Sequence, residues 1–123
     1  MAKRPVLVPF DYVLRTDRDL PAEEQTIWHL RPVTASEWEI IEHAQRLDNA
    51  EYHAHARMIL DYGLLGWSNY DGDPGRVEAP RKKVGSRLCL EASILDQISP
   101  YIFELAQAIT ETRFLDAESR KNS

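Results

Sequence analysis

The chain has 123 residues, of which 43% are hydrophobic and 28% charged, and its formal net charge at pH 7 is -5. This length suits one domain with one core, and the composition excludes an intrinsically disordered chain. The negative net charge disfavours binding to nucleic acids and to anionic membrane surfaces. The single cysteine, Cys89, excludes an intramolecular disulfide framework and a site built from several thiolates, which fits a reducing compartment.

Hydropathy indicates neither a membrane span nor a signal peptide. The apolar stretch that follows the N-terminal basic residues is interrupted by Pro9 and Asp11, so it is too short for a signal-peptide core. No other stretch approaches the roughly 18 apolar residues that cross a bilayer. We therefore expect one soluble domain over residues 1–123 that is not exported by a classical signal.

Two segments near the N-terminus alternate between apolar and polar residues, as strands do. The first extends from Val6 to Leu14, and the second, after a polar connection over Arg15–Gln25, extends from Thr26 to Val33. In the second segment Trp28 and Leu30 share one side. Together the two segments predict an antiparallel pair of strands.

Helical spacing predominates in the next part of the chain. Thr34 and Glu37 have the spacing of a capping box, which predicts a helix that ends near Asp48. A second helix is expected from about Ala50 until Gly63 loosens it. The apolar stripe of this second helix comprises Tyr52, Ala56, Ile59, Leu60 and Leu64.

A long exposed loop is expected after the second helix. The segment from Ser68 to Val84 has few apolar residues and contains Gly72, Pro74, Gly75 and Pro80. Loops of this length are uncommon unless they are functional or mobile. The sequence therefore predicts a loop over about residues 68–86 that is flexible or is ordered by a partner.

Two helices are expected in the C-terminal part, the first over Leu88–Ile98. Ser99 and Pro100 predict the start of the second, with the serine as N-cap and the proline at the first helical position. Its apolar face comprises Ile102, Leu105, Ala106 and Ile109, and a polar tail follows over about residues 116–123. The fold class predicted from these elements is α+β, with an N-terminal antiparallel β pair packed on three to four α-helices.

The spacing of the histidines and of an aspartate-rich turn does not support a metal site. His53 and His55 point to different faces of one helix, His43 belongs to another, and a catalytic zinc ion needs three convergent ligands. In a calcium loop that begins at Asp71, the twelfth position is Lys82, where a bidentate glutamate is required. No metal and no cofactor is therefore predicted.

Sequence motifs for covalent catalysis are also missing. The chain has no Gly-x-Ser-x-Gly elbow, its five glycines are too scattered for a phosphate-binding loop, and Cys89 has no evident activator. We therefore predict that the protein is not an enzyme. A small enzyme would require Cys89 or the histidines to converge on a pocket.

Positive charge is concentrated in and beside the expected loop of this acidic chain. A basic loop of this kind either docks on an acidic partner or is merely solvated. Trp67, which follows two glycines and two leucines, is either part of the core or an interface anchor. Arg81, Lys82 and Lys83, as loop residues, are expected to be replaceable without loss of stability. The predicted protein-binding residues are Trp67, Arg76, Arg81, Lys82, Lys83 and Arg87.

Three segments carry a resemblance to a known group of proteins. The first runs from Asp17 through Glu23-Glu24-Gln25-Thr26 to Arg31-Pro32-Val33-Thr34, and the second is Gly63-Leu64-x-Gly66-Trp67-x-Asn69. The third runs from Ile98-Ser99-Pro100 through Glu104-Leu105-Ala106-x-Ala108-Ile109 to Leu115, Glu118 and Lys121-Asn122. With these segments the chain resembles small morphogenesis proteins of tailed bacteriophages and is similar to tail assembly chaperones.

The resemblance implies a protein that acts by binding and has no small-molecule substrate and no membrane partner. Its partners would be phage structural proteins, namely tail or capsid subunits, and it would act in the cytoplasm of the host bacterium during virion assembly. The alternative that shares the resemblance is a structural component of the virion, such as a capsid decoration, neck or tail-completion protein. Retention in the particle and self-association stay open at this point.

Overall fold

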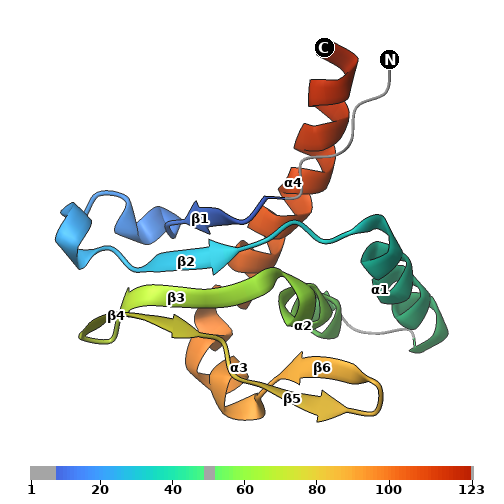
Figure 1. Ribbon diagram of the computed structural model, residues 1–123, viewed down its shortest axis with the longest axis horizontal. Coiled ribbons are helices and arrows are strands. Elements are labelled where there is room, and N and C mark those ends of the chain that lie inside the picture. The colour runs from blue at the N-terminus through green and yellow to red at the C-terminus, as the bar shows by residue number, and fades with distance from the viewer. Residues whose placement is uncertain (1–7, 49–51, 123) are drawn as a thin grey trace.

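Four antiparallel strands form the main sheet, and two further strands form a separate hairpin (Figure 1). The computed structural model describes residues 8–48 and 52–122. The sheet consists, in spatial and chain order, of β1 (Phe10–Tyr12), β2 (Ile27–Leu30), β3 (Leu64–Tyr70) and β4 (Asp73–Glu78). The hairpin consists of β5 (Arg81–Val84) and β6 (Arg87–Leu90).

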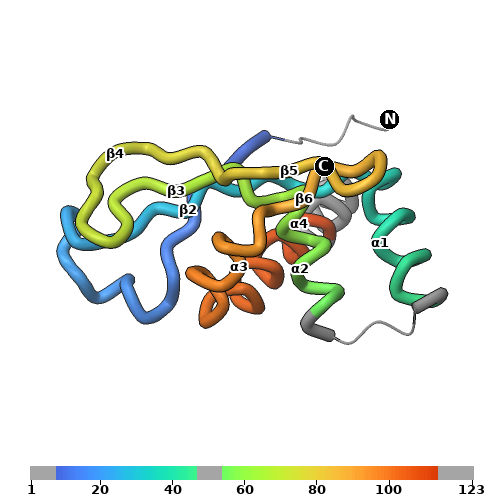
Figure 2. Tube along the Cα trace, turned by 90° about the horizontal axis from the view of Figure 1, so that it is seen from below, coloured from blue at the N-terminus to red at the C-terminus, as the bar shows by residue number. Residues whose placement is uncertain are grey.

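Helices cover one face of this sheet. The α-helices are α1 (Ala35–Asp48), α2 (Tyr52–Gly63), α3 (Ala92–Ile98) and α4 (Ile102–Asn122). Three short 3-10 helices connect the other elements: η1 (Arg15–Asp17), η2 (Ala22–Glu24) and η3 (Ser99–Tyr101). Seen from below, the strands lie along one side of the molecule and the helices along the other (Figure 2).

The predicted α+β class is confirmed, and the predicted N-terminal β pair exists, but that pair is only half of the sheet. β1 and β2 are antiparallel, with Tyr12 opposite Trp28. Trp28 is in turn opposite Trp67 of β3, a strand that the sequence did not predict. Paired residues of neighbouring strands share a face, so the two tryptophans both face the helices and both are buried.

The prediction of a long loop over residues 68–86 is wrong, because this segment contains the end of β3 and all of β4 and β5. β4 lies at an edge of the sheet. All of its residues are exposed except Val77, which is partly buried. An edge strand of this kind lacks the apolar alternation by which strands are recognised. Asn69 (φ 57°), Asp71 (φ 51°) and Gly72 (φ 82°) supply the left-handed backbone that turns the chain from β3 into β4.

The second prediction that fails is a helix over Leu88–Ile98. Its first part is β6, which pairs with β5 from Val84↔Arg87 to Arg81↔Leu90, and helix α3 begins only at Ala92. Ser99 is not an N-cap but the first residue of η3, and the tail predicted to begin at about residue 116 belongs to α4. Leu88 and Leu90 are two residues apart, which is the strand period and not the helical one, and the pairing with β5 places them on one face of the hairpin.

Two helix predictions are confirmed at the level of side chains. Thr34 and Glu37 form the capping box of α1, because the Glu37 amide donates to Thr34 Oγ1 (3.2 Å) and the Thr34 amide donates to Glu37 Oε1 (2.9 Å). In α4, Ile102, Leu105 and Ile109 are all buried in the core. The described helices include none that is both long and apolar enough to span a membrane.

The Gly-Leu-x-Gly-Trp-x-Asn segment has structural roles throughout. A Cβ on Gly66 would lie 2.1 Å from the Val77 carbonyl oxygen, so only glycine lets β4 approach β3. Trp67 packs against Trp28, with ring centroids 5.9 Å apart. The side-chain amide of Asn69 donates to the carbonyl oxygens of Glu23 and Gln25 and so fixes the connection between β1 and β2.

Candidate functional site

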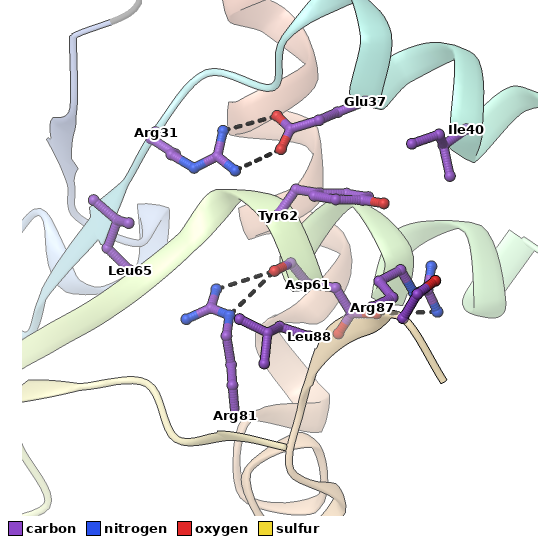
Figure 3. A pocket seen from close by; sticks show the side chains of 10 residues that line it. Arg31, Glu37, Ile40, Asp61, Tyr62, Leu65, Arg81, Arg87 and Leu88 are labelled. Carbon is purple, nitrogen blue, oxygen red and sulfur yellow. Dashed lines mark hydrogen bonds and ion pairs between the residues drawn. The ribbon is translucent and has the colours of Figure 1, made fainter. Parts of the chain in front are cut away.

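The candidate site is a pair of clefts on the two sides of the β5–β6 hairpin. The first has a volume of about 540 Å³ and opens between α1, the end of α2, the start of β3 and the hairpin (Figure 3). Its lining comprises Arg31, Glu37, Ile40, Asp61, Tyr62, Leu65, Arg81, Ser86, Arg87 and Leu88. Because the hairpin and its turn supply Arg81, Ser86, Arg87 and Leu88, the cleft is complete only when the hairpin is docked.

Arg31 and Glu37 form a bidentate ion pair that lines part of the first cleft. Arg31 directly follows β2, and Glu37 belongs to the capping box of α1. Arg31 Nη1 and Nη2 donate to Glu37 Oε1 (2.9 Å) and Oε2 (2.8 Å). These hydrogen bonds, together with the Thr34 amide, lower the pKa of Glu37 below its ordinary value of 4.5, although burial acts in the opposite direction. The pair is thus charged at neutral pH, and each charge is already compensated.

Asp61, near the end of α2, is the buried carboxylate that the two clefts share. Its residue is 8% exposed, and its Oδ1 accepts the Leu90 amide at 2.9 Å, which ties β6 to α2. Burial raises the pKa of Asp61 above its ordinary value of 3.8, while the Leu90 amide and Arg87 act in the opposite direction. Arg87 Nη2 lies 3.7 Å from Asp61 Oδ2, which is longer than a hydrogen bond.

Arg81 lies on β5 and not in the predicted loop, and its side chain is hydrogen-bonded to the neighbouring backbone. Its guanidinium donates to the carbonyl oxygens of Asp61 (3.2 and 3.1 Å) and of Leu64. The last carbonyls of a helix have no partner within the helix and form the negative end of its dipole. Arg81 therefore caps the C-terminal end of α2 and joins the hairpin to it (Figure 3).

Exposed apolar side chains form the rim of the first cleft. Ile40 on α1 is 50% exposed and Leu88 on β6 is 59% exposed, and both line this cleft. Tyr62 and Leu65 belong to the same lining. This arrangement, an apolar rim around polar groups that already have partners, suits the apolar side chains of another protein.

The second cleft has a volume of about 370 Å³ and lies on the opposite face of the hairpin, against α2 and α3. Lys82 and Arg87 of the hairpin and Arg57 of α2 supply its positive charge, and Asp61 is the one carboxylate among the described residues that line it. Its apolar lining comprises Ala54, Met58, Val84, Cys89, Leu90, Ala92 and Leu95. The sequence predicted Lys82 and Arg87 as binding residues but not the Arg57 that meets them here.

The other predicted binding residues lie outside both clefts. Trp67 is only 5% exposed and packs between Trp28 and Tyr70, so it is a core residue and not an accessible anchor. Arg76 is exposed on β4 opposite Ser68, and Lys83 is exposed on β5. The structure thus separates the predicted basic group into a capping residue, a cleft-lining pair and two solvated cations.

A buried histidine that the sequence did not single out links three strands. His29 Nδ1 lies 2.7 Å from Asp11 Oδ1, and His29 Nε2 lies 2.7 Å from Ser68 Oγ. The residues stand on β1, β2 and β3, and neither cleft is lined by them. The Asp11 side chain is 68% exposed, and we interpret the trio as a bridge that holds the short strand β1 on the sheet.

Within the described residues, no group of three or more histidine, cysteine, aspartate or glutamate side chains is arranged to hold a metal ion. Comparisons of the chain with protein-family models, with curated proteins and with solved structures give no match. The interpretation of the site therefore depends on its own geometry and on the sequence resemblance described above.

Proposed function

We propose that the protein is a non-enzymatic bacteriophage assembly factor, similar to tail assembly chaperones, that acts by binding another protein. The observation that carries the proposal is the first cleft, where Ile40 and Leu88 expose apolar surface beside charges that are already paired. Apolar side chains held in water are expected at binding surfaces. The resemblance to phage morphogenesis proteins makes a tail or capsid subunit the expected partner.

Binding at this cleft has a direct consequence for an assembly factor. A subunit that exposes apolar segments before assembly is prone to aggregate, and covering such a segment keeps it soluble. The charged groups of the cleft face partners within the protein, since Arg31 is paired with Glu37, Arg81 with backbone carbonyls, and Arg87 lies 3.7 Å from Asp61. The cleft therefore takes an apolar segment without leaving a buried charge unpaired.

The test is co-expression and pull-down of the protein with tail and capsid subunits encoded in the same genome. Wild type is expected to bind one of them and to raise its soluble fraction, whereas Ile40→Ser with Leu88→Ser should weaken binding at least about tenfold. Leu20→Ser is the control, because Leu20 is 40% exposed but lines neither cleft. Equal binding by all three proteins would contradict the proposal.

The alternative, a structural virion component such as a capsid decoration, neck or tail-completion protein, would use the same binding surface. The two differ in the fate of the protein and not in its chemistry. Mass spectrometry of purified particles separates them, since a chaperone is expected to be absent from the particle and a structural component to be present in stoichiometric amount.

A hydrolase is the second candidate, favoured by the Asp11–His29–Ser68 trio, whose order and 2.7 Å distances match those of an acyl-transfer triad. A triad also needs donors for the oxyanion and room for a substrate. Since neither cleft includes Ser68, we expect no turnover of p-nitrophenyl acetate and no labelling by a fluorophosphonate. Activity or labelling that Ser68→Ala abolishes would establish the hydrolase instead.

A further inference from the structure

The second cleft combines positive charge with apolar surface in a way that specifies its ligand. Along the hairpin, Lys82 pairs with Cys89 and Val84 pairs with Arg87. Paired residues share a face, and all four of these residues line the second cleft against α2 and α3. One face of the hairpin therefore forms a wall of this cleft.

Charge in this cleft is unbalanced. Among the described residues of its lining, Arg57, Lys82 and Arg87 face one carboxylate, Asp61, whose Oδ1 already accepts the Leu90 amide. Arg57 and Lys82 are exposed, and neither side chain makes a hydrogen bond or ion pair within the described residues. In a chain of net charge -5, this is a local site of opposite sign.

Apolar side chains lie directly beside these cations. Met58 of α2 and Leu95 of α3 contribute to the wall, and Val84 of the hairpin is 53% exposed. A site for a hydrated anion alone would not present this surface. The combination suits a segment in which carboxylates alternate with apolar side chains, because the carboxylates meet the cations while the apolar groups cover Met58 and Val84.

We propose that the second cleft binds the carboxylates of an acidic, apolar segment of a partner protein, an inference that rests on the proposed function for its protein partner. Arg87 and Asp61 line both clefts, so these two residues lie between the clefts. The partner segment would place its acidic residues near Arg57 and Lys82 and its apolar side chains on Met58 and Val84.

The experiment selects binders of the purified full chain from a display library of random dodecapeptides. The selected peptides are expected to carry a net negative charge and several large apolar residues. The best of them, labelled with fluorescein, is then titrated by fluorescence anisotropy. Arg57→Gln with Lys82→Gln should raise its Kd about tenfold at low salt and flatten the dependence of Kd on salt concentration, because screening acts on charges this variant lacks.

The matched control is Arg76→Gln with Lys83→Gln, which also removes two exposed positive charges but from residues that line neither cleft. It should bind the peptide within about twofold of wild type. The inference is overturned if no peptide is selected, if the peptides are neutral or basic, or if the two double variants lose affinity equally. It is also overturned if wild type forms a dimer that Arg57→Gln with Lys82→Gln dissociates, since the occupant would then be a second copy.

This experiment and the pull-down fail independently. Capture of a phage subunit that depends on Ile40 and Leu88 but not on Arg57 and Lys82 would remove the acidic-segment site and leave the proposed function. Selection of acidic peptides without capture of any phage subunit would leave the site and remove the phage assignment.

Discussion

Leu105→Ala should lower the free energy of unfolding by about 2–5 kcal/mol, which is the cost of removing a fully buried leucine side chain from a core that relaxes only in part. Leu105 is 0% exposed and lies in α4, within the core cluster that also contains Ile102 and Ile109. Because α4 packs against α2, the cavity would open where two helices meet.

Urea denaturation of wild type and variant, followed by circular dichroism, measures this loss. Gln107→Ala is the control on the same helix, since Gln107 is exposed and such a change is expected to alter stability by less than about 0.5 kcal/mol. A loss for Leu105→Ala that is no larger than that of the control would remove α4 from the core.

Helices α1 and α4 could be predicted because their signals are local. Thr34 and Glu37 are three residues apart, and the residues that bury α4 recur at the helical period, so the sequence itself contains both patterns. Strands β4 to β6 carry no comparable pattern. In β4 only Val77 is partly buried, and all other residues are exposed. In the hairpin, Lys83 and Leu88 become neighbours only through the pairing of β5 with β6.

The clefts could be predicted only in part, because their residues meet through contacts that are distant in the sequence. Lys82 and Arg87 stood out as positive charges in an acidic chain, yet Arg57 and Asp61 look like ordinary surface residues of a helix. Nothing in the sequence marks Ile40 or Leu88 as exposed, since each has apolar neighbours that are buried. Exposure of a large apolar residue is a property of the packed fold and not of a local pattern.

The contacts of Arg81 were equally invisible in the sequence. It looked like a free loop charge, but its side chain is bound to the end of α2. Its guanidinium is the polar link between the hairpin and the carbonyls at the end of α2. Hydrogen bonds to a charged group contribute about 1.5–3 kcal/mol each, and carbonyls left without a partner carry an additional cost. Replacement by a residue that keeps the aliphatic stem isolates this contribution from packing.

Arg81→Met should therefore lower the free energy of unfolding by about 2–3 kcal/mol, whereas Lys83→Met, on the same strand but exposed, should change it by less than about 0.5 kcal/mol. Arg81→Lys should fall between them, because lysine keeps the charge at the helix end but lacks the planar fork that reaches several carbonyls. Amide hydrogen exchange adds a local readout, since Leu90, whose amide binds Asp61, should lose protection in Arg81→Met as the hairpin detaches. If Arg81→Met and Lys83→Met unfold at the same urea concentration, Arg81 is a solvated cation after all and belongs with Lys82 on the docking surface.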